Sequence, residues 1–266
     1  MVRTALTRRF GVLVALVMAV VAMPMSPRPA LAAMPGEQVL TAAQQAEALA
    51  GMTPEERAHL SKIWSDPANL PVAYTRALFE VTTDPAGRTI VRPVGGYDVT
   101  TGALRLPNTL TAASSGTGGA YNLYISISVW RTSASGVYEW GTENYFQWTG
   151  APPDACNTVE ESFGTSWAGD LYLNSDNWTG WYYLDTVDSV PMYRSDFTAN
   201  EGVGWSFNEY HFWPRPDACD YVYQGRAAAY IREPNWQNRT DNVGIKYVHT
   251  KGGTLSYSLS FLNASI

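Results

Sequence analysis

Alternation of apolar and polar positions dominates the chain from about Ala77 onward. Apolar side chains occupy every second position of residues 121–131, which predicts a β-strand with one face in a core and the other half-solvated. After a turn at residues 132–136, residues 137–148 repeat this period and complete an antiparallel hairpin. One face of this return strand would carry Tyr138, Trp140, Phe146 and Trp148, and the other Glu139, Glu143 and Tyr145.

The C-terminal residues follow the same rule. Residues 243–250 and 254–261 alternate on either side of a Lys251-Gly252-Gly253 turn, which predicts a second hairpin. Shorter strands are predicted at residues 78–82, 89–94, 159–163, 171–173, 178–184, 204–213 and 225–231, and a loop rich in Ser, Thr and Gly at residues 109–120. Many strands separated by Gly and Pro predict a mainly β chain, folded as an antiparallel β-sandwich or a barrel-like variant.

Residues with a helical pattern precede the predicted strands in the chain. Residues 40–50 are rich in Ala and Gln and end at Gly51, which predicts a first helix. Thr53-Pro54-Glu55-Glu56 then supplies an N-cap, a proline at the first helical position and a capping-box glutamate for a second helix to about Trp64. Its apolar stripe would dock on the β domain while the polar side faces water. The stripe is Leu60, Ile63 and Trp64, and the polar side includes Arg57 and His59.

The first 32 residues have the order of a secretory signal peptide: arginines, an apolar run of 13 residues from Gly11 to Met23, and an Ala30-Leu31-Ala32 end. We expect cleavage near Ala32. The apolar run is shorter than the roughly 20 residues of a membrane-spanning helix. Thr7-Arg8-Arg9-Phe10 leaves the twin-arginine export route open beside the general secretory route. The predicted organisation is therefore a signal peptide (1–32), a helical N-terminal segment (33–76) and a β-sandwich domain (77–266).

Charge narrows the range of partners. The signal region carries four arginines and no acidic residue, so its removal changes the net charge from −6 to −10. An acidic chain lacks the basic surface that nucleic acids and anionic membranes require. We therefore expect neither of them as a partner, and we expect no membrane span.

The only two cysteines share one context. Each closes a Pro-Asp-Ala-Cys tetrapeptide, at Cys156 and Cys219, after an aromatic strand-like run. In an exported chain this pairing favours one Cys156–Cys219 disulfide over two buried free thiols. Two cysteines cannot form a structural zinc site, and the Asn- and Asp-rich residues 174–177 lack the spacing of a calcium-binding EF-hand loop. We predict no metal and no cofactor.

Carboxylates on strands suggest one catalytic alternative, whereas no Gly-x-Ser-x-Gly motif supports a serine hydrolase. The strand predicted over 204–213 would place on one face Trp205, Phe207, Glu209, His211 and Trp213. A glutamate among aromatic residues suits general acid chemistry, and a glycoside hydrolase would need a second carboxylate such as Glu143 or Glu139 roughly 5 to 10 Å away. The simpler alternative is that Glu209 pairs with Arg215 or Arg226 while Glu139 and Glu143 are solvated.

Aromatic residues suggest binding instead. The chain has 10 Trp and 16 Tyr, and Trp178, Trp181 and Tyr183 lie close together in one predicted strand. Exposed indole and phenol rings offer flat apolar faces with polar edges, on which sugars or peptides stack. These three residues are the candidate ligand-binding strip, and the alternative is that they belong to the core.

The C-terminal hairpin also carries a family resemblance. Lys246-Tyr247-Val248-His249-Thr250, followed by a Gly-Gly turn and a Ser-alternating strand, resembles the last hairpin of uncharacterised secreted β proteins of Gram-positive bacteria. The resemblance implies secretion and a β fold, and it brings no activity or site residue. We interpret the chain as a secreted, noncatalytic β domain that binds a glycan or cell-envelope component. The alternatives are a carbohydrate-active hydrolase and a secreted domain with a structural or protein-binding role.

Overall fold

The fold is described from a computed structural model of the chain. The structure describes residues 31–33, 37–86, 89–99, 111–112, 121–134, 137–149, 160–167, 172–173, 179–183, 189–191, 193–198, 202–208, 210–211, 220–233, 242–251 and 254–265.

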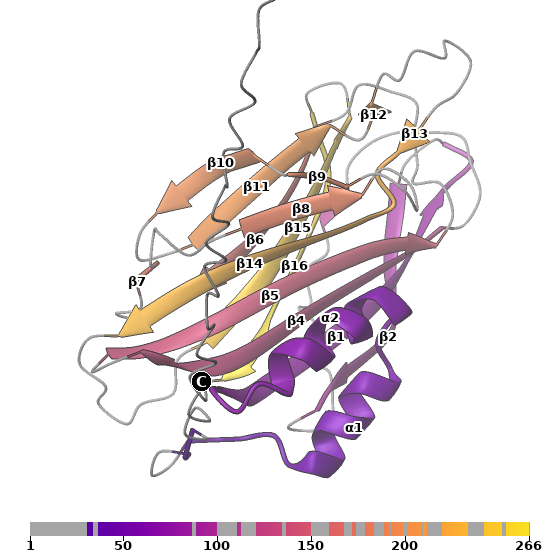
Figure 1. Cartoon of the computed structure of the whole chain (residues 1–266). Helices are drawn as coiled ribbons and strands as arrows, with labels where there is room; N and C mark the ends of the chain where they lie inside the picture. Colours follow the sequence, from indigo (N-terminus) through magenta and orange to yellow (C-terminus); the bar gives the residue numbers. More distant parts are fainter. Residues whose placement is uncertain are drawn as a thin grey trace, which may run out of the picture.

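Two antiparallel sheets form the body of the protein (Figure 1). Sheet 1 follows the order β2-β1-β4-β5-β14-β8-β9, and β7 also pairs with β14. Its strands are β1 (Asn69–Thr83), β2 (Thr89–Asp98), β4 (Tyr121–Ala134), β5 (Val137–Thr149), β7 (Tyr172–Leu173), β8 (Thr179–Tyr183), β9 (Ser189–Pro191) and β14 (Gln224–Glu233).

Sheet 2 follows the order β10-β11-β6-β15-β16-β3, and β12 and β13 form a separate two-stranded sheet. These strands are β3 (Thr111–Ala112), β6 (Glu160–Trp167), β10 (Tyr193–Thr198), β11 (Gly202–Asn208), β12 (Tyr210–His211), β13 (Asp220–Tyr221), β15 (Asn242–Lys251) and β16 (Thr254–Ser265).

The main hydrophobic core lies between the two sheets. Phe146 of β5 in sheet 1 contacts three aromatic rings of sheet 2, with centroids 5.1 to 5.4 Å away. Those rings belong to Phe163, Phe207 and Tyr247. Aromatic pairs of this kind add stability beyond the apolar area that they bury. The sheets therefore pack face to face, and the expectation of a mainly β chain with an N-terminal helical segment is confirmed.

Both helices cover the outer face of sheet 1 (Figure 1, indigo). Helix α1 (Ala42–Ala50) ends at Gly51, as the sequence predicts, and begins at a complete capping box of Thr41 and Gln44, which was not predicted. Helix α2 (Pro54–Trp64) buries Leu60 and Trp64 in a second apolar cluster with residues of β1 and β4. The predicted docking stripe is thus confirmed.

The two helices bury part of the outer face of β4, which corrects the prediction that this face is half-solvated. The face of β4 opposite the main core is not half-solvated: Ser126, Ser128 and Trp130 are each 1% exposed. The Trp130 indole covers Gly141 of β5 so closely that an added Cβ there would lie 2.3 Å from the ring. A sheet face looks solvated in the sequence when its cover comes from a distant segment, because serine carries no sign of what covers it.

Other differences concern strand ends. Strand β1 begins at Asn69, well before Ala77, because residues 72–75 are buried on both faces and show no alternation. The strand predicted over 204–213 divides into β11, which ends at Asn208, and β12 in the separate sheet. Short β3 lies within the predicted loop, and β9, β10 and β13 were not predicted.

Candidate functional site

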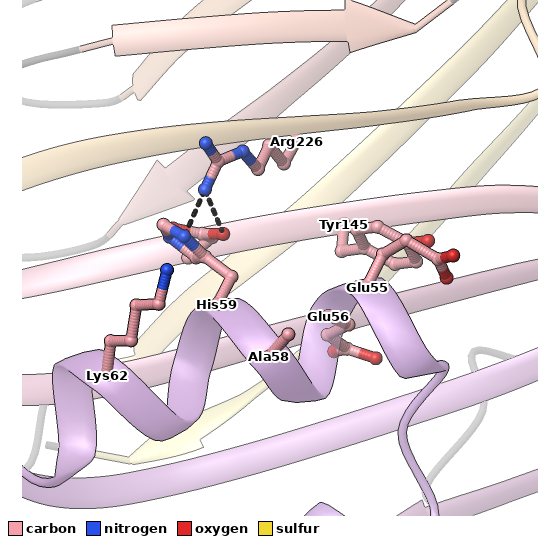
Figure 2. Close-up of a pocket in the computed structure, with 8 residues that line it drawn as sticks. Glu55, Glu56, Ala58, His59, Lys62, Tyr145 and Arg226 are labelled. Carbon is pink, nitrogen blue, oxygen red and sulfur yellow. Dashed lines mark hydrogen bonds and ion pairs between the residues drawn. The ribbon is translucent and has the colours of Figure 1, made fainter. Parts of the chain in front are cut away.

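A charged cluster connects the middle of α2 with the outer face of sheet 1 (Figure 2). Nε2 of His59 lies 2.7 Å from Oε2 of Glu143 on β5, and Nδ1 of the same ring contacts Nη1 of Arg226 on β14. Nη1 of Arg226 also lies 3.8 Å from Oε1 of Glu143. Three elements far apart in the chain thus bring a histidine, a carboxylate and a guanidinium together.

The contacts fix the protonation of the imidazole ring. A guanidinium has only N–H donors, so the Nδ1 atom of His59 that contacts Arg226 must accept a hydrogen bond. The proton is then on Nε2, which donates to Glu143. His59 therefore bridges Glu143 and Arg226, and Glu143 receives hydrogen bonding from the ring together with the charge of Arg226.

The same cluster separates two cavities of about 210 Å³ each. The first extends along α2 past Lys62 and Tyr145, and the second lies over Ala228 and Tyr230 of the sheet. In Figure 2 the amino group of Lys62 points from α2 toward the His59 side of the first cavity. We call the two spaces together the α2 cavities.

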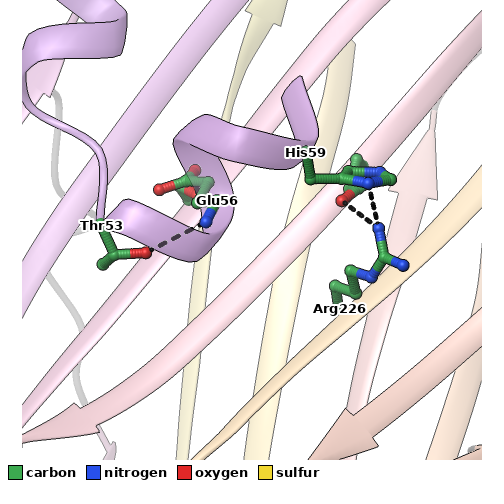
Figure 3. Close-up of polar contacts among 6 residues, drawn as sticks. Thr53, Glu56, His59 and Arg226 are labelled. Carbon is green, nitrogen blue, oxygen red and sulfur yellow. Dashed lines mark hydrogen bonds and ion pairs between the residues drawn. The ribbon is translucent and has the colours of Figure 1, made fainter. Parts of the chain in front are cut away.

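A second polar network anchors the first turn of α2 (Figure 3). Thr53 caps the helix by accepting from the N–H of Glu56 at 3.3 Å, as predicted. The Glu56 carboxylate does not turn back to complete a capping box. It is buried against the sheet, where it accepts hydrogen bonds from Tyr124 at 2.8 Å, from Tyr74 at 3.3 Å and from Ser126.

The environment of Glu56 changes its acidity. Burial raises the pKa of Glu56 to about 7, against the lowering effect of the hydroxyl donors of Ser126, Tyr124 and Tyr74, and the charge of Glu143 raises it slightly further. Burial likewise raises the pKa of Tyr145, whose hydroxyl is 2.8 Å from Oε1 of Gln224. Glu56, which borders the first α2 cavity, therefore changes its charge near physiological pH, whereas Tyr145 beside it stays neutral there.

The structure places several predicted site residues on the face that carries the α2 cavities. Glu139 and Glu143 share it, and they are 9% and 6% exposed, which corrects the expectation that they are solvated. The register pairs residue 181 with Arg226 and residue 183 with Gln224, so both positions lie on the outer face of sheet 1. Members of both sets of candidates, proposed from the sequence for different functions, thus share one face of sheet 1.

Other predicted residues lie elsewhere or outside the described ranges. Glu209, Trp178, Cys156 and Cys219 are outside them. His211 belongs to β12, whose partner is β13, and not to β11. Trp205 and Phe207 are buried in the main core. Because Glu209 lies outside the described residues, its place beside those two aromatic residues stays a prediction.

Sequence reasoning missed the central residue of the cluster. His59 was expected to face water as a surface residue, yet its side chain is only 32% exposed and bonds to two strands. Arg57, expected to be exposed on the same helix, is exposed. The one available signal was that the sequence offers Arg226 as a partner for a glutamate. Among the described residues, Glu143 forms an ion pair with it.

Two searches of the described residues gave negative findings. Within the described ranges, no three or more His, Cys, Asp or Glu side chains are grouped so as to hold a metal ion. Among the helices that the structure describes, none is long and apolar enough to cross a bilayer.

Comparison with known proteins identifies no family. No protein-family model matches the chain, and a search of curated proteins gives no match. A collagen-binding domain from a Staphylococcus aureus adhesin is 7% identical at a TM-score of 0.29, covering 49% of this chain and 98% of the adhesin domain. A second structure is described as manganese lipoxygenase of Gaeumannomyces graminis with a partial structure of zonadhesin of Komagataella pastoris. It is 8% identical at a TM-score of 0.28, and the match covers 73% of this chain and 86% of the other chain. At such TM-scores neither likeness supports a conclusion.

Proposed function

We propose that the protein is a noncatalytic extracellular domain that binds a glycan on the outer face of sheet 1, beside α2. One observation carries the proposal: the strand register continues the row of Tyr145 and Arg226 directly to Trp181. On this face, the position of Trp181 is thus next to Arg226 across the strands. Glu143 lies in the adjacent row of cross-strand pairs, opposite Ala228.

This combination matches the chemistry of sugars. A pyranose ring presents an apolar C–H face, which stacks on indole rings, and hydroxyl groups, which bond to charged and amide side chains. Around the α2 cavities, Lys62 and Arg226 offer donors. Each cavity is smaller than the roughly 300 to 1,000 Å³ of pockets that enclose a whole drug-sized ligand. The surface therefore suits one face of a polymer better than an enclosed small molecule.

Secretion belongs to the same proposal. The N-terminal sequence has the order of an export signal, and the mature chain would be acidic, which disfavours nucleic acids and anionic membranes as partners. An exported β domain would meet glycans at a cell envelope or outside it. The Cys156–Cys219 disulfide remains part of the proposal. Strand β5 ends before Cys156 in the chain, and β14 begins after Cys219. The backbone N–H of Trp148 donates to the carbonyl of Tyr223 at 2.7 Å, so these two parts of the chain are adjacent.

Catalysis is the alternative that the same surface allows. A hydrolase would use Glu143 or Glu139 with Glu209, and it needs a carboxylate free to reach the sugar. Glu143 is instead bonded to His59 and Arg226, and the third glutamate near it, Glu56, is covered by α2. These contacts favour binding over hydrolysis.

The test is a glycan array and a pull-down with insoluble polysaccharides, using the mature chain and two variants of Trp181. Trp181→Ala removes the aromatic face, and Trp181→Phe retains a smaller one. We expect binding by the wild type, loss of at least tenfold in affinity in Trp181→Ala, in line with about 1.4 kcal/mol or more for a stacked ring, and an intermediate loss in Trp181→Phe.

A second readout separates the alternatives. Release of reducing sugars that is abolished by Glu143→Gln would establish the hydrolase in place of the binding domain. Wild-type chain that retains no polysaccharide and binds no glycan on the array would refute the proposal and leave a structural or protein-binding role. Equal binding by the wild type and Trp181→Ala would place any glycan site on another surface.

A further inference from the structure

A third cavity lies on the other flank of the helical layer, over β1 and β2. Its volume is about 370 Å³, and it is bounded by Arg76, Leu78, Tyr97 and Tyr124, with Gly51 at the end of α1. In the order of sheet 1 it lies over β2, β1 and β4, whereas the α2 cavities lie over β5 and β14. It is a separate site from the one proposed for glycans.

At this cavity the Arg76 guanidinium lies close to both the Tyr97 ring and Gly51. Its guanidinium carbon lies 5.5 Å from the centroid of the Tyr97 ring, in a cation–π contact. On the other side it lies against Gly51, where an added Cβ would be 1.3 Å from Nη1. The guanidinium therefore occupies space that only a glycine at the end of α1 leaves open.

The described part of the chain gives the Arg76 guanidinium no polar partner. Among the residues that the structure describes, Arg76 forms no hydrogen bond and no ion pair. Two carboxylates near the rings that line this cavity are bonded to phenol groups: Glu47 to Tyr97, and Glu56 to Tyr124. Five N–H donors on a fixed group thus remain for a ligand or for water.

Helix capping does not account for this arginine. A cation near a helix C-terminus is favourable, and Arg76 lies near the C-terminus of α1. However, Arg57 already donates to the carbonyl oxygens of Ala50 at 3.3 Å and Met52 at 3.1 Å. The carbonyl groups at this end of the helix therefore have a different donor.

We propose that this cavity binds a small organic carboxylate, with its carboxylate on the Arg76 guanidinium and its apolar body against Leu78 and the Tyr124 ring. The planar fork of a guanidinium matches a carboxylate with two parallel hydrogen bonds. Most of the remaining wall is aliphatic or aromatic carbon, which favours a carboxylate with a hydrocarbon body over a fully hydrated anion.

The experiment is calorimetric titration of the full mature chain with benzoate, phenylacetate and cyclohexanecarboxylate, each beside its uncharged amide. We expect at least one carboxylate to bind at 1:1 stoichiometry and its amide to bind at least tenfold more weakly. Arg76→Ala should weaken the carboxylate about tenfold to a hundredfold, as for loss of hydrogen bonds to a charged group.

Two further variants keep the proposal testable if Arg76→Ala disturbs folding. Gly51→Ala keeps every charge, and alanine readily adopts the φ of −96° and ψ of 0° found at this position. The Cβ of the new alanine would displace the Arg76 guanidinium. It should also weaken binding at least tenfold. The matched control is Arg92→Ala, which removes an exposed arginine from β2 and should leave binding unchanged.

Three results would overturn the proposal. The first is failure of all three carboxylates to bind the wild type. The second is equal affinity in the wild type, Arg76→Ala and Gly51→Ala. The third is binding of inorganic phosphate in place of the carboxylates. None of them bears on the glycan site, whose variants lie on β5, β8 and β14.

Discussion

Replacing Glu56 with glutamine should change how stability depends on pH. Glu56 is buried under α2 and accepts hydrogen bonds from three hydroxyl groups. Glutamine has nearly the same shape as the protonated acid, and its amide group can donate where the acid O–H would donate. Glu56→Gln therefore imitates the neutral form at every pH.

The magnitude follows from the raised pKa. Burial raises the pKa of Glu56 from 4.5 to about 7, so between these values the folded protein binds more protons than the unfolded chain. The stability that comes from holding the proton is complete below the unfolded pKa and is lost as pH rises through the folded pKa. A difference of this size corresponds to about 3 kcal/mol of unfolding free energy.

Urea denaturation followed by tryptophan fluorescence measures this effect, from about pH 5 to about pH 8. The unfolding free energy of Glu56→Gln minus that of the wild type should rise by about 3 kcal/mol across this range, because only the wild type loses the proton. Contributions of groups that titrate alike in both proteins cancel in the difference. Glu55→Gln, which alters the exposed neighbouring glutamate, should give a flat difference. A flat difference for Glu56→Gln as well would refute the reasoning.

Three further predictions concern stability and covalent structure. Thr53→Ala removes the N-cap of α2 and should lower the unfolding free energy by about 1 kcal/mol in urea denaturation, and an unchanged midpoint would contradict the capping role. Gly141→Ala pushes a Cβ into the indole that covers it and should cost about 1–3 kcal/mol, whereas Gly95→Ala, with no atom within 4 Å of its Cβ, should be far milder; equal losses would contradict the packing described. Unreduced, denatured mature chain should contain no titratable thiol, and reduction should cost about 4 kcal/mol; two reactive thiols per chain would disprove the disulfide.

Much of the local structure could be predicted from the sequence, because it depends on neighbouring residues. Thr53 and Pro54 mark the start of α2, and Gly51 marks the end of α1. Alternation along β4 and β5 correctly separates core residues such as Phe146 from the opposite face with Glu143. These features follow from capping chemistry and from the two-residue period of a strand.

The candidate site could not be predicted, because its members meet only through tertiary packing. His59 lies on the polar side of an amphipathic helix, and nothing in its neighbourhood shows that this side approaches β5 and β14. The pairing of residue 181 with Arg226 depends on β14 lying between β5 and β8, which is a matter of sheet order. The first part of β1 was missed for a related reason, since both of its faces are buried and its sequence has no alternation.

The most direct test of the central claim is the affinity of the mature chain for its best array glycan, compared between Arg226→Ala and Arg232→Ala. Both arginines lie on the same face of β14, but Arg226 borders the α2 cavities, while Arg232 is exposed and pairs in register with Glu139. The account predicts at least tenfold weaker binding for Arg226→Ala, as for loss of hydrogen bonds from a charged group, and wild-type affinity for Arg232→Ala. Equal affinities in the two variants would contradict a glycan site at this surface.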